Sequence, residues 1–156
     1  TMKQVGTPWH KTPLLAMKRG PYVSYSVLSE TAIAEDQTLL GYYVNLFSGD
    51  LKILKDPVLK VGSVGLLYDL SYRDSEPASL IAVSGRSDNI QVEDRSISFT
   101  VDGTLGYAGN GIISCSMAPK AVEASVEVEW TYCEVTGTAS FTLGAAEGPI
   151  SIRFIF

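Results

Sequence analysis

The chain has 156 residues, of which 46% are hydrophobic and 19% are charged, a balance typical of a globular domain and far from that of a disordered chain. Its 12 basic and 17 acidic residues give a net charge of −5, which excludes the clustered positive charge that nucleic-acid binding requires. No apolar run approaches the roughly 18 residues of a membrane span, so we expect none in this chain.

A period of two dominates the chain, and it predicts strands from near the N-terminus to the end. Residues 1–13 precede the first strand as an extended segment, in which Pro8 and Pro13 flank Trp9 and His10. Turn sequences rich in glycine separate the strands, which recur roughly every 8–12 residues, as in a sandwich or a barrel. The predicted strands cover residues 23–27, 39–47, 64–70, 80–83, 96–101, 112–117, 122–132, 138–143 and 150–156.

Three segments alternate most cleanly, namely residues 96–101, 138–143 and 150–156. Each places apolar side chains on one face and Ser, Thr or Arg on the other, as an antiparallel sheet with one buried face requires. We therefore predict an all-β fold with little or no helix: one antiparallel β-sandwich domain over residues 1–156, immunoglobulin-like or jelly-roll-like. Residues 29–37 could form one helical turn or a loop.

The sequence lacks the residue sets that the common catalytic mechanisms need. His10 is the single histidine, and no Gly-x-Ser-x-Gly turn is present to position a nucleophilic serine. Glu127 and Glu129 have a spacing that would suit a glycosidase pair, but they lie on the polar face of their strand. We predict that the chain is not an enzyme, that it needs no cofactor and that it holds no metal.

Three further polar or reactive residues have structural interpretations. Asp69 interrupts an apolar run, and a hydrogen bond to a turn at the sheet edge would explain it. Cys115 falls on the apolar face of its strand and Cys133 on the polar face of another. Sulfurs on opposite faces of a sheet cannot bond, so we predict two free thiols, with Cys115 unreactive in the core.

Aromatic residues offer the most plausible ligand site, because sugars stack on exposed rings. Trp130 and Tyr132 share a face with valines, which places them in the core or at its edge. Trp9, Tyr43 and Tyr107 are the candidates for an exposed ligand-binding platform, with glycan as the candidate ligand. The alternative is that these rings cover another part of the domain or a neighbouring domain.

Three stretches carry a resemblance to a known class of module: residues 8–22, residues 41–70 with Leu46-Phe47 and Tyr68-Asp69-Leu70, and residues 118–152. In this order they resemble the C-terminal β-sandwich accessory module that follows the catalytic barrel in some bacterial glycoside hydrolase-like proteins. Ser48 stands where those modules usually have Asp. The resemblance implies a fragment of a larger protein, with any catalytic carboxylates outside this chain.

The leading hypothesis is therefore a non-catalytic accessory domain that packs against a neighbouring catalytic domain or shapes the rim of its active-site cleft. It predicts an exposed apolar patch, for which Trp9 and Pro13 are candidates. The alternatives are a free-standing carbohydrate-binding module and a structural or adhesive surface domain that associates through an edge strand. Through the parent protein, we expect a location outside the cytoplasm.

Overall fold

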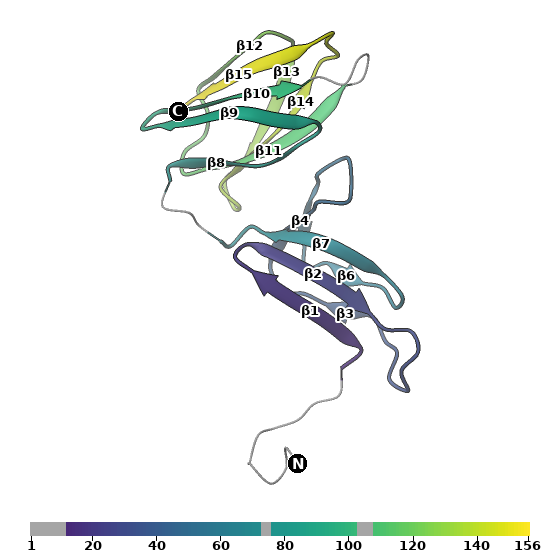
Figure 1. The fold of residues 1–156 in the computed structure, drawn as a ribbon. Coiled ribbons are helices and arrows are strands. Elements are labelled where there is room, and N and C mark those ends of the chain that lie inside the picture. The colour runs from purple at the N-terminus through teal and green to yellow at the C-terminus, as the bar shows by residue number, and fades with distance from the viewer. Residues whose placement is uncertain (1–11, 73–75, 103–107) are drawn as a thin grey trace.

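The computed structural model describes residues 12–72, 76–102 and 108–156 (Figure 1), and within these ranges it contains strands and turns but no helix. The prediction of an all-β fold with an antiparallel β-sandwich is confirmed. The strands are β1 (Leu14–Arg19), β2 (Tyr22–Val27), β3 (Gln37–Thr38), β4 (Tyr42–Asn45), β5 (Ile53–Lys55), β6 (Val58–Leu59), β7 (Val64–Asp69), β8 (Ala78–Val83), β9 (Arg86–Glu93), β10 (Ser96–Asp102), β11 (Gly109–Cys115), β12 (Ala121–Ala124), β13 (Val128–Cys133), β14 (Thr138–Leu143) and β15 (Pro149–Ile155).

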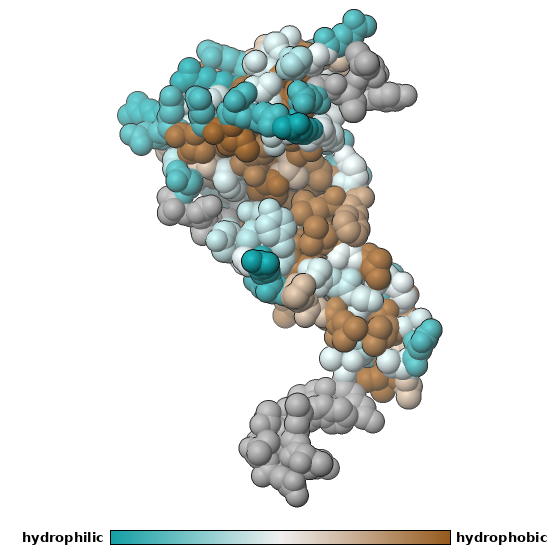
Figure 2. Space-filling model, viewed as in Figure 1, coloured by the Kyte–Doolittle hydropathy of each residue, from teal (hydrophilic) through white to brown (hydrophobic). Residues whose placement is uncertain are grey.

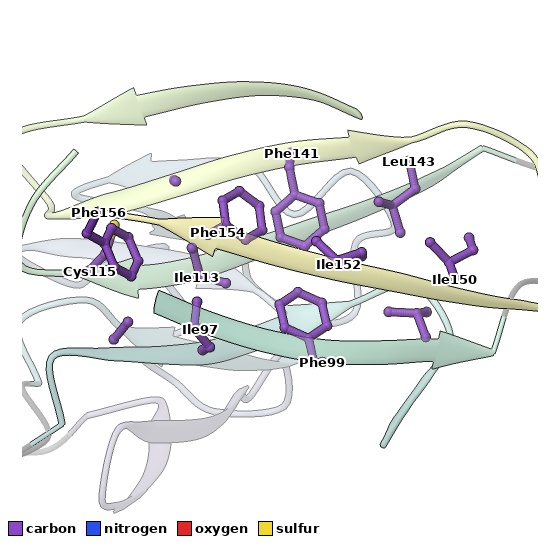
Figure 3. Packing of buried hydrophobic residues seen from close by; sticks show 13 residues of the cluster. Ile97, Phe99, Ile113, Cys115, Phe141, Leu143, Ile150, Ile152, Phe154 and Phe156 are labelled. Atoms are coloured by element: carbon purple, nitrogen blue, oxygen red, sulfur yellow. The ribbon is translucent and has the colours of Figure 1, made fainter. Parts of the chain in front are cut away.

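The sandwich consists of two four-stranded antiparallel sheets, ordered β12-β15-β10-β9 and β13-β14-β11-β8. Their inner faces meet in the sandwich core, where three phenylalanine rings, Phe99, Phe141 and Phe154, lie with centroids 5.1–6.4 Å apart (Figure 3). The three cleanly alternating segments supply β10, β14 and β15, and their apolar residues are almost completely buried here. The period of two thus decides which face of each strand enters the core.

A five-stranded antiparallel sheet, ordered β1-β2-β7-β4-β5, precedes the sandwich and is called here the first sheet. One of its faces is covered by Leu59 of β6 and by the partly buried Leu39, which pack against Val23, Val27 and Leu67. β6 pairs with β3 in a separate two-stranded ladder (Figure 1). This face of the first sheet is therefore closed by the chain's own loops.

The first sheet and the sandwich meet in an apolar contact, called here the junction. Val44 and Tyr68 come from the first sheet, Leu70 directly follows β7, and Ile81 and Ile112 come from the outer face of the sandwich sheet β13-β14-β11-β8. All five side chains are buried. The prediction of one domain over residues 1–156 stays a prediction, but this contact joins the two parts by hydrophobic packing as well as by the connecting chain.

One local expectation differs from the structure, and one open alternative is decided by it. The segment predicted as one strand over residues 122–132 is split between β12 and β13, which belong to opposite sheets of the sandwich. The polar residues Ser125 and Glu127 fall in the connection, where the chain crosses between sheets. Of the two alternatives for residues 29–37, the loop is observed: the Ala34 N–H donates to the Thr31 carbonyl at 3.2 Å in a turn, and β3 begins at Gln37.

Candidate functional site

The face of the first sheet opposite its closed face carries exposed apolar side chains. Register places Leu15 of β1 beside Ser26 and then Val64 of β7, and it places Met17 beside Ser24 and then Leu66. Leu15, Met17 and Val64 are 59%, 69% and 67% exposed. With Tyr22 and Leu66 they form what we call the uncovered apolar face.

The uncovered apolar face continues directly into the junction. Tyr22 lies opposite Tyr68 in the ladder, and their rings make an edge-to-face contact with centroids 5.5 Å apart and planes at 87°. Tyr68 and Val44, on the same side of the sheet, are buried against the sandwich. One sheet face is thus half covered by the sandwich and half left open; Figure 2 shows apolar side chains both on the first sheet and around the junction.

Where the open and covered halves meet, a groove of about 360 Å³ runs between the first sheet and the edge of β8. Tyr22, Leu46 and Phe47 line one side, and Val83 and Ser84 line the other. Phe47 is 71% exposed, and it lies in the turn that follows β4, where its backbone N–H donates to Asn45 Oδ1 at 2.9 Å. Exposed aromatic rings beside an apolar face are typical of residues at protein–protein interfaces.

Asp69, at the end of β7, is held by an ion pair and a turn. Lys18 Nζ lies 2.5 Å from Asp69 Oδ2, and the N–H and hydroxyl of Ser71 donate to Oδ1 at 2.9 and 2.6 Å. Burial acts to raise the pKa of Asp69, but these bonds outweigh it and hold the pKa below its usual range. The expected hydrogen bond to a turn is confirmed.

The aromatic residues predicted to form a ligand platform do not come together in the structure. Tyr43 is only 8% exposed, so the expectation of an exposed ring there is wrong. β4 is an inner strand of the first sheet, with the junction on one face and Leu59 and Leu67 on the other, so its alternation could not separate buried from exposed positions. Trp9 and Tyr107 lie outside the described residues.

The other residues singled out by sequence have plain structural roles. Pro13 was expected in an exposed patch but is buried, and its carbonyl accepts a hydrogen bond from the Leu28 N–H at 2.8 Å. Trp130 and Tyr132 are partly buried against the sandwich core, as predicted. Glu127 and Glu129 are exposed.

Both cysteines are free, and they lie on opposite faces of the sheet β13-β14-β11-β8. Cys115 belongs to the sandwich core, and burial raises the pKa of its thiol to about 11. Cys133 is partly exposed, and hydrogen bonds from the side chain and backbone of Thr136 lower the pKa of its thiol. The parity argument from sequence thus placed both sulfurs on their correct faces.

Sequence reasoning missed the residues of the uncovered apolar face. Leu15 and Met17 stand in an apolar run beside Lys18 and Arg19, which gives no clean alternation. A usable signal lay in β2, since Ser24 and Ser26 mark a face that the core does not occupy.

The part of the chain that the structure describes contains no cluster of three His, Cys, Asp or Glu side chains suited to a metal. Nor does it hold a helix with the length and hydropathy to cross a membrane.

No protein-family model matches the chain, and no curated protein matches it. Among solved structures, the chain is similar to a GH31 dextranase from Flavobacterium johnsoniae, FjDex31A, complexed with glucose. The TM-score is 0.42 and the identity is 10%; the similarity covers 85% of this chain and 26% of the dextranase chain. A likeness at this TM-score carries no argument about function.

Proposed function

We propose that this chain is a non-catalytic accessory domain of a larger glycan-processing protein, and that it packs against a neighbouring catalytic domain through the uncovered apolar face. The observation that carries the proposal is the exposure of Leu15, Met17 and Val64 on a sheet face whose other half is already buried. Contiguous apolar surface of this kind marks contact sites on soluble domains. The glycan-processing context comes from the sequence resemblance.

The shape of this surface favours a protein partner over a small ligand. Leu15 and Met17 stand on β1 and Val64 stands on β7, and β2 places only the small Ser24 and Ser26 between them. A partner that extended the packing at the junction would cover these side chains and the exposed ring of Phe47 together. Aromatic and methionine side chains are enriched at the centres of such interfaces.

Hydrogen–deuterium exchange tests the proposal on the natural polypeptide. We expect the amides of β1 and β2 to exchange at least tenfold more slowly in the parent protein than in the isolated 156-residue chain, because a docked domain would shield this edge. Equal exchange in the two contexts, or a natural polypeptide no longer than this chain, would contradict the proposal.

A matched pair of methionine variants localises the contact. Met17→Glu places a charge on the uncovered apolar face, whereas Met117→Glu places the same charge at a position that is 52% exposed in a sandwich loop. In the parent protein, Met17→Glu should abolish the added protection of β1 and β2, and Met117→Glu should leave it unchanged. An equal effect of both variants would show that the added protection does not arise from this face.

A further inference from the structure

A second surface, on the sandwich, has a different chemistry. The outer face of the sheet β12-β15-β10-β9 is hollowed into a groove of about 490 Å³, within the volume range of small-ligand sites. In Figure 1 this sheet lies at the end of the molecule opposite β1. The groove is therefore separate from the uncovered apolar face.

Two rows of polar side chains line the groove, and strand register carries the first row across all four strands. The first row is Gln91, Ser98, Arg153 and Glu123, which are direct cross-strand partners. The second row starts at Asn89, next to the Asp88 that pairs with Thr100, and continues through Thr100 and Ser151 to Ser125, which follows β12 and accepts from the Ser151 N–H. Ser98, Thr100 and Ser151 place short side chains on the two middle strands, β10 and β15. Arg153 also lies on β15, but its guanidinium is bonded to Glu93 and Ser96.

A β-bulge forms one rim of the groove. The register between β9 and β10 shifts between Ser98 and Thr100, and Asn89 adopts a φ of 54°. Asparagine tolerates this left-handed conformation better than most residues. Bulges re-aim side chains, and this one sets the Asn89 amide among the residues that line the groove.

The one arginine at the groove is matched by acidic side chains. Arg153 donates to Glu93 Oε2 at 3.1 Å and to the Ser96 hydroxyl at 3.2 Å, and Ser96 donates to the same carboxylate oxygen at 2.8 Å. Glu123 lies directly opposite Arg153 in the β12–β15 ladder. One arginine facing two glutamates leaves no positive surplus, so an anionic ligand gains no net attraction.

Several groove side chains have unused hydrogen-bonding capacity. Asn89, Gln91, Ser98 and Thr100 make no side-chain hydrogen bond with another described residue. Amides and hydroxyls both donate and accept, so this lining matches a ligand that presents many hydroxyl groups. Phe99 contributes no ring to the groove, because it is 2% exposed and packs into the sandwich core.

We propose that this groove binds a neutral oligosaccharide laid across the strands. The rows span three inter-strand spacings, about 14 Å, which suits a chain of several sugar units. The described lining residues can hydrogen-bond a sugar but provide no ring for it to stack on. We therefore expect weak binding, with a dissociation constant of about 1 mM. The inference takes its glycan context from the proposed function but does not involve the docking face.

The test is an NMR titration of the 15N-labelled chain with neutral tetrasaccharides of glucose, xylose and mannose in α and β linkage, each up to 20 mM. At least one tetrasaccharide should shift the amides of residues 89–91, 98–100, 123–125 and 151–153, and its monosaccharide should bind at least tenfold more weakly. No shift with any sugar, equal binding of the monosaccharide, or shifts confined to another surface would overturn the proposal.

Groove variants complete the test. Gln91→Ala should weaken binding at least threefold, and so should Asn89→Gly, which removes the amide but accepts the positive φ. Thr131→Ala on the outer face of the opposite sheet is the control and should bind as the unaltered chain does. Unchanged binding by both groove variants would overturn the proposal, whereas Met17→Glu should leave sugar binding intact whether or not docking occurs.

Discussion

Ile112 and Ile113 are consecutive residues of β11 and both are completely buried, but they lie in different cores. Ile113 points between the two sandwich sheets, where Ala139 is its cross-strand partner. Ile112 points out of the sandwich into the junction with Val44, Tyr68 and Leu70. One strand therefore connects the sandwich core to the first sheet.

Truncation of these two isoleucines should weaken different parts of the molecule. Ile112→Ala and Ile113→Ala should each lower the free energy of unfolding by about 2–5 kcal/mol, the usual range for a buried isoleucine. In hydrogen–deuterium exchange, Ile112→Ala should speed exchange mainly in β4 and β7. Ile113→Ala should speed it mainly in β10, β14 and β15. The same exchange pattern in both variants would contradict the separation of the two cores.

Gly111 is a position where a single methyl group should be poorly tolerated. It lies directly opposite Phe141, and a Cβ added to it would collide with that ring. Gly111→Ala should therefore cost about 2–3 kcal/mol of stability, measured by urea denaturation, because the phenylalanine must leave its packed position. Gly49→Ala, where an added Cβ meets nothing within 4 Å, is the control and should change stability by less than about 0.5 kcal/mol.

Alternation in the sequence predicts the buried residues of a strand best where one face of that strand is buried and the other is exposed. Residues 96–101, 138–143 and 150–156 meet this condition, and their apolar residues form the sandwich core. Tyr43 does not, because β4 is covered on both faces and alternation there says nothing about exposure.

Pairing between distant strands is what the sequence leaves open. β9 was not predicted, since Arg86-Ser87-Asp88-Asn89-Ile90 has no alternating apolar face and the strand is paired only along one edge. Both surfaces proposed as sites depend on such pairing: Leu15 and Val64 meet through β2, and Gln91 and Glu123 are joined through β10 and β15. Local periodicity carries no information about which strands become neighbours.

The Lys18–Asp69 pair should make stability depend on pH on the acid side. The pKa of Asp69 is lowered in the folded chain, so its contribution is present above the unfolded value of about 3.9 and is lost as the pH falls through the lower folded value. Asp69→Asn should cost about 1–3 kcal/mol at pH 7, because it removes the charge that pairs with Lys18.

The stability difference between the unaltered chain and Asp69→Asn should shrink below about pH 4, because Asp69 is protonated there in the unfolded chain and only at lower pH in the folded chain. Urea denaturation at pH 7, 5 and 3 measures it. Glu127→Gln, at an exposed position, is the control and should stay within about 0.5 kcal/mol of the unaltered chain at pH 7. A constant difference for Asp69→Asn from pH 7 to 3 would argue against the ion pair.

The two thiols should differ strongly in reactivity, because only the thiolate is nucleophilic. Burial raises the pKa of Cys115 to about 11, whereas hydrogen bonds from Thr136 lower the pKa of the partly exposed Cys133. In the folded chain at pH 8, iodoacetamide should modify Cys133 alone, and Cys133→Ser should remove the labelling. In urea both cysteines should react, which controls for the reagent.

Two variants of Thr136 distinguish the effect of its hydrogen bond on the reactivity of Cys133 from the effect of the exposure of the Cys133 sulfur. Thr136→Ser keeps the hydroxyl and should keep the labelling rate of Cys133, whereas Thr136→Val removes the donor and should slow labelling several-fold at pH 8. Thr136 also shares a hydrogen bond of 2.7 Å with Thr138, so the fold of both variants must be checked by circular dichroism. Equal labelling rates in two folded variants would mean that accessibility alone sets the reactivity of Cys133.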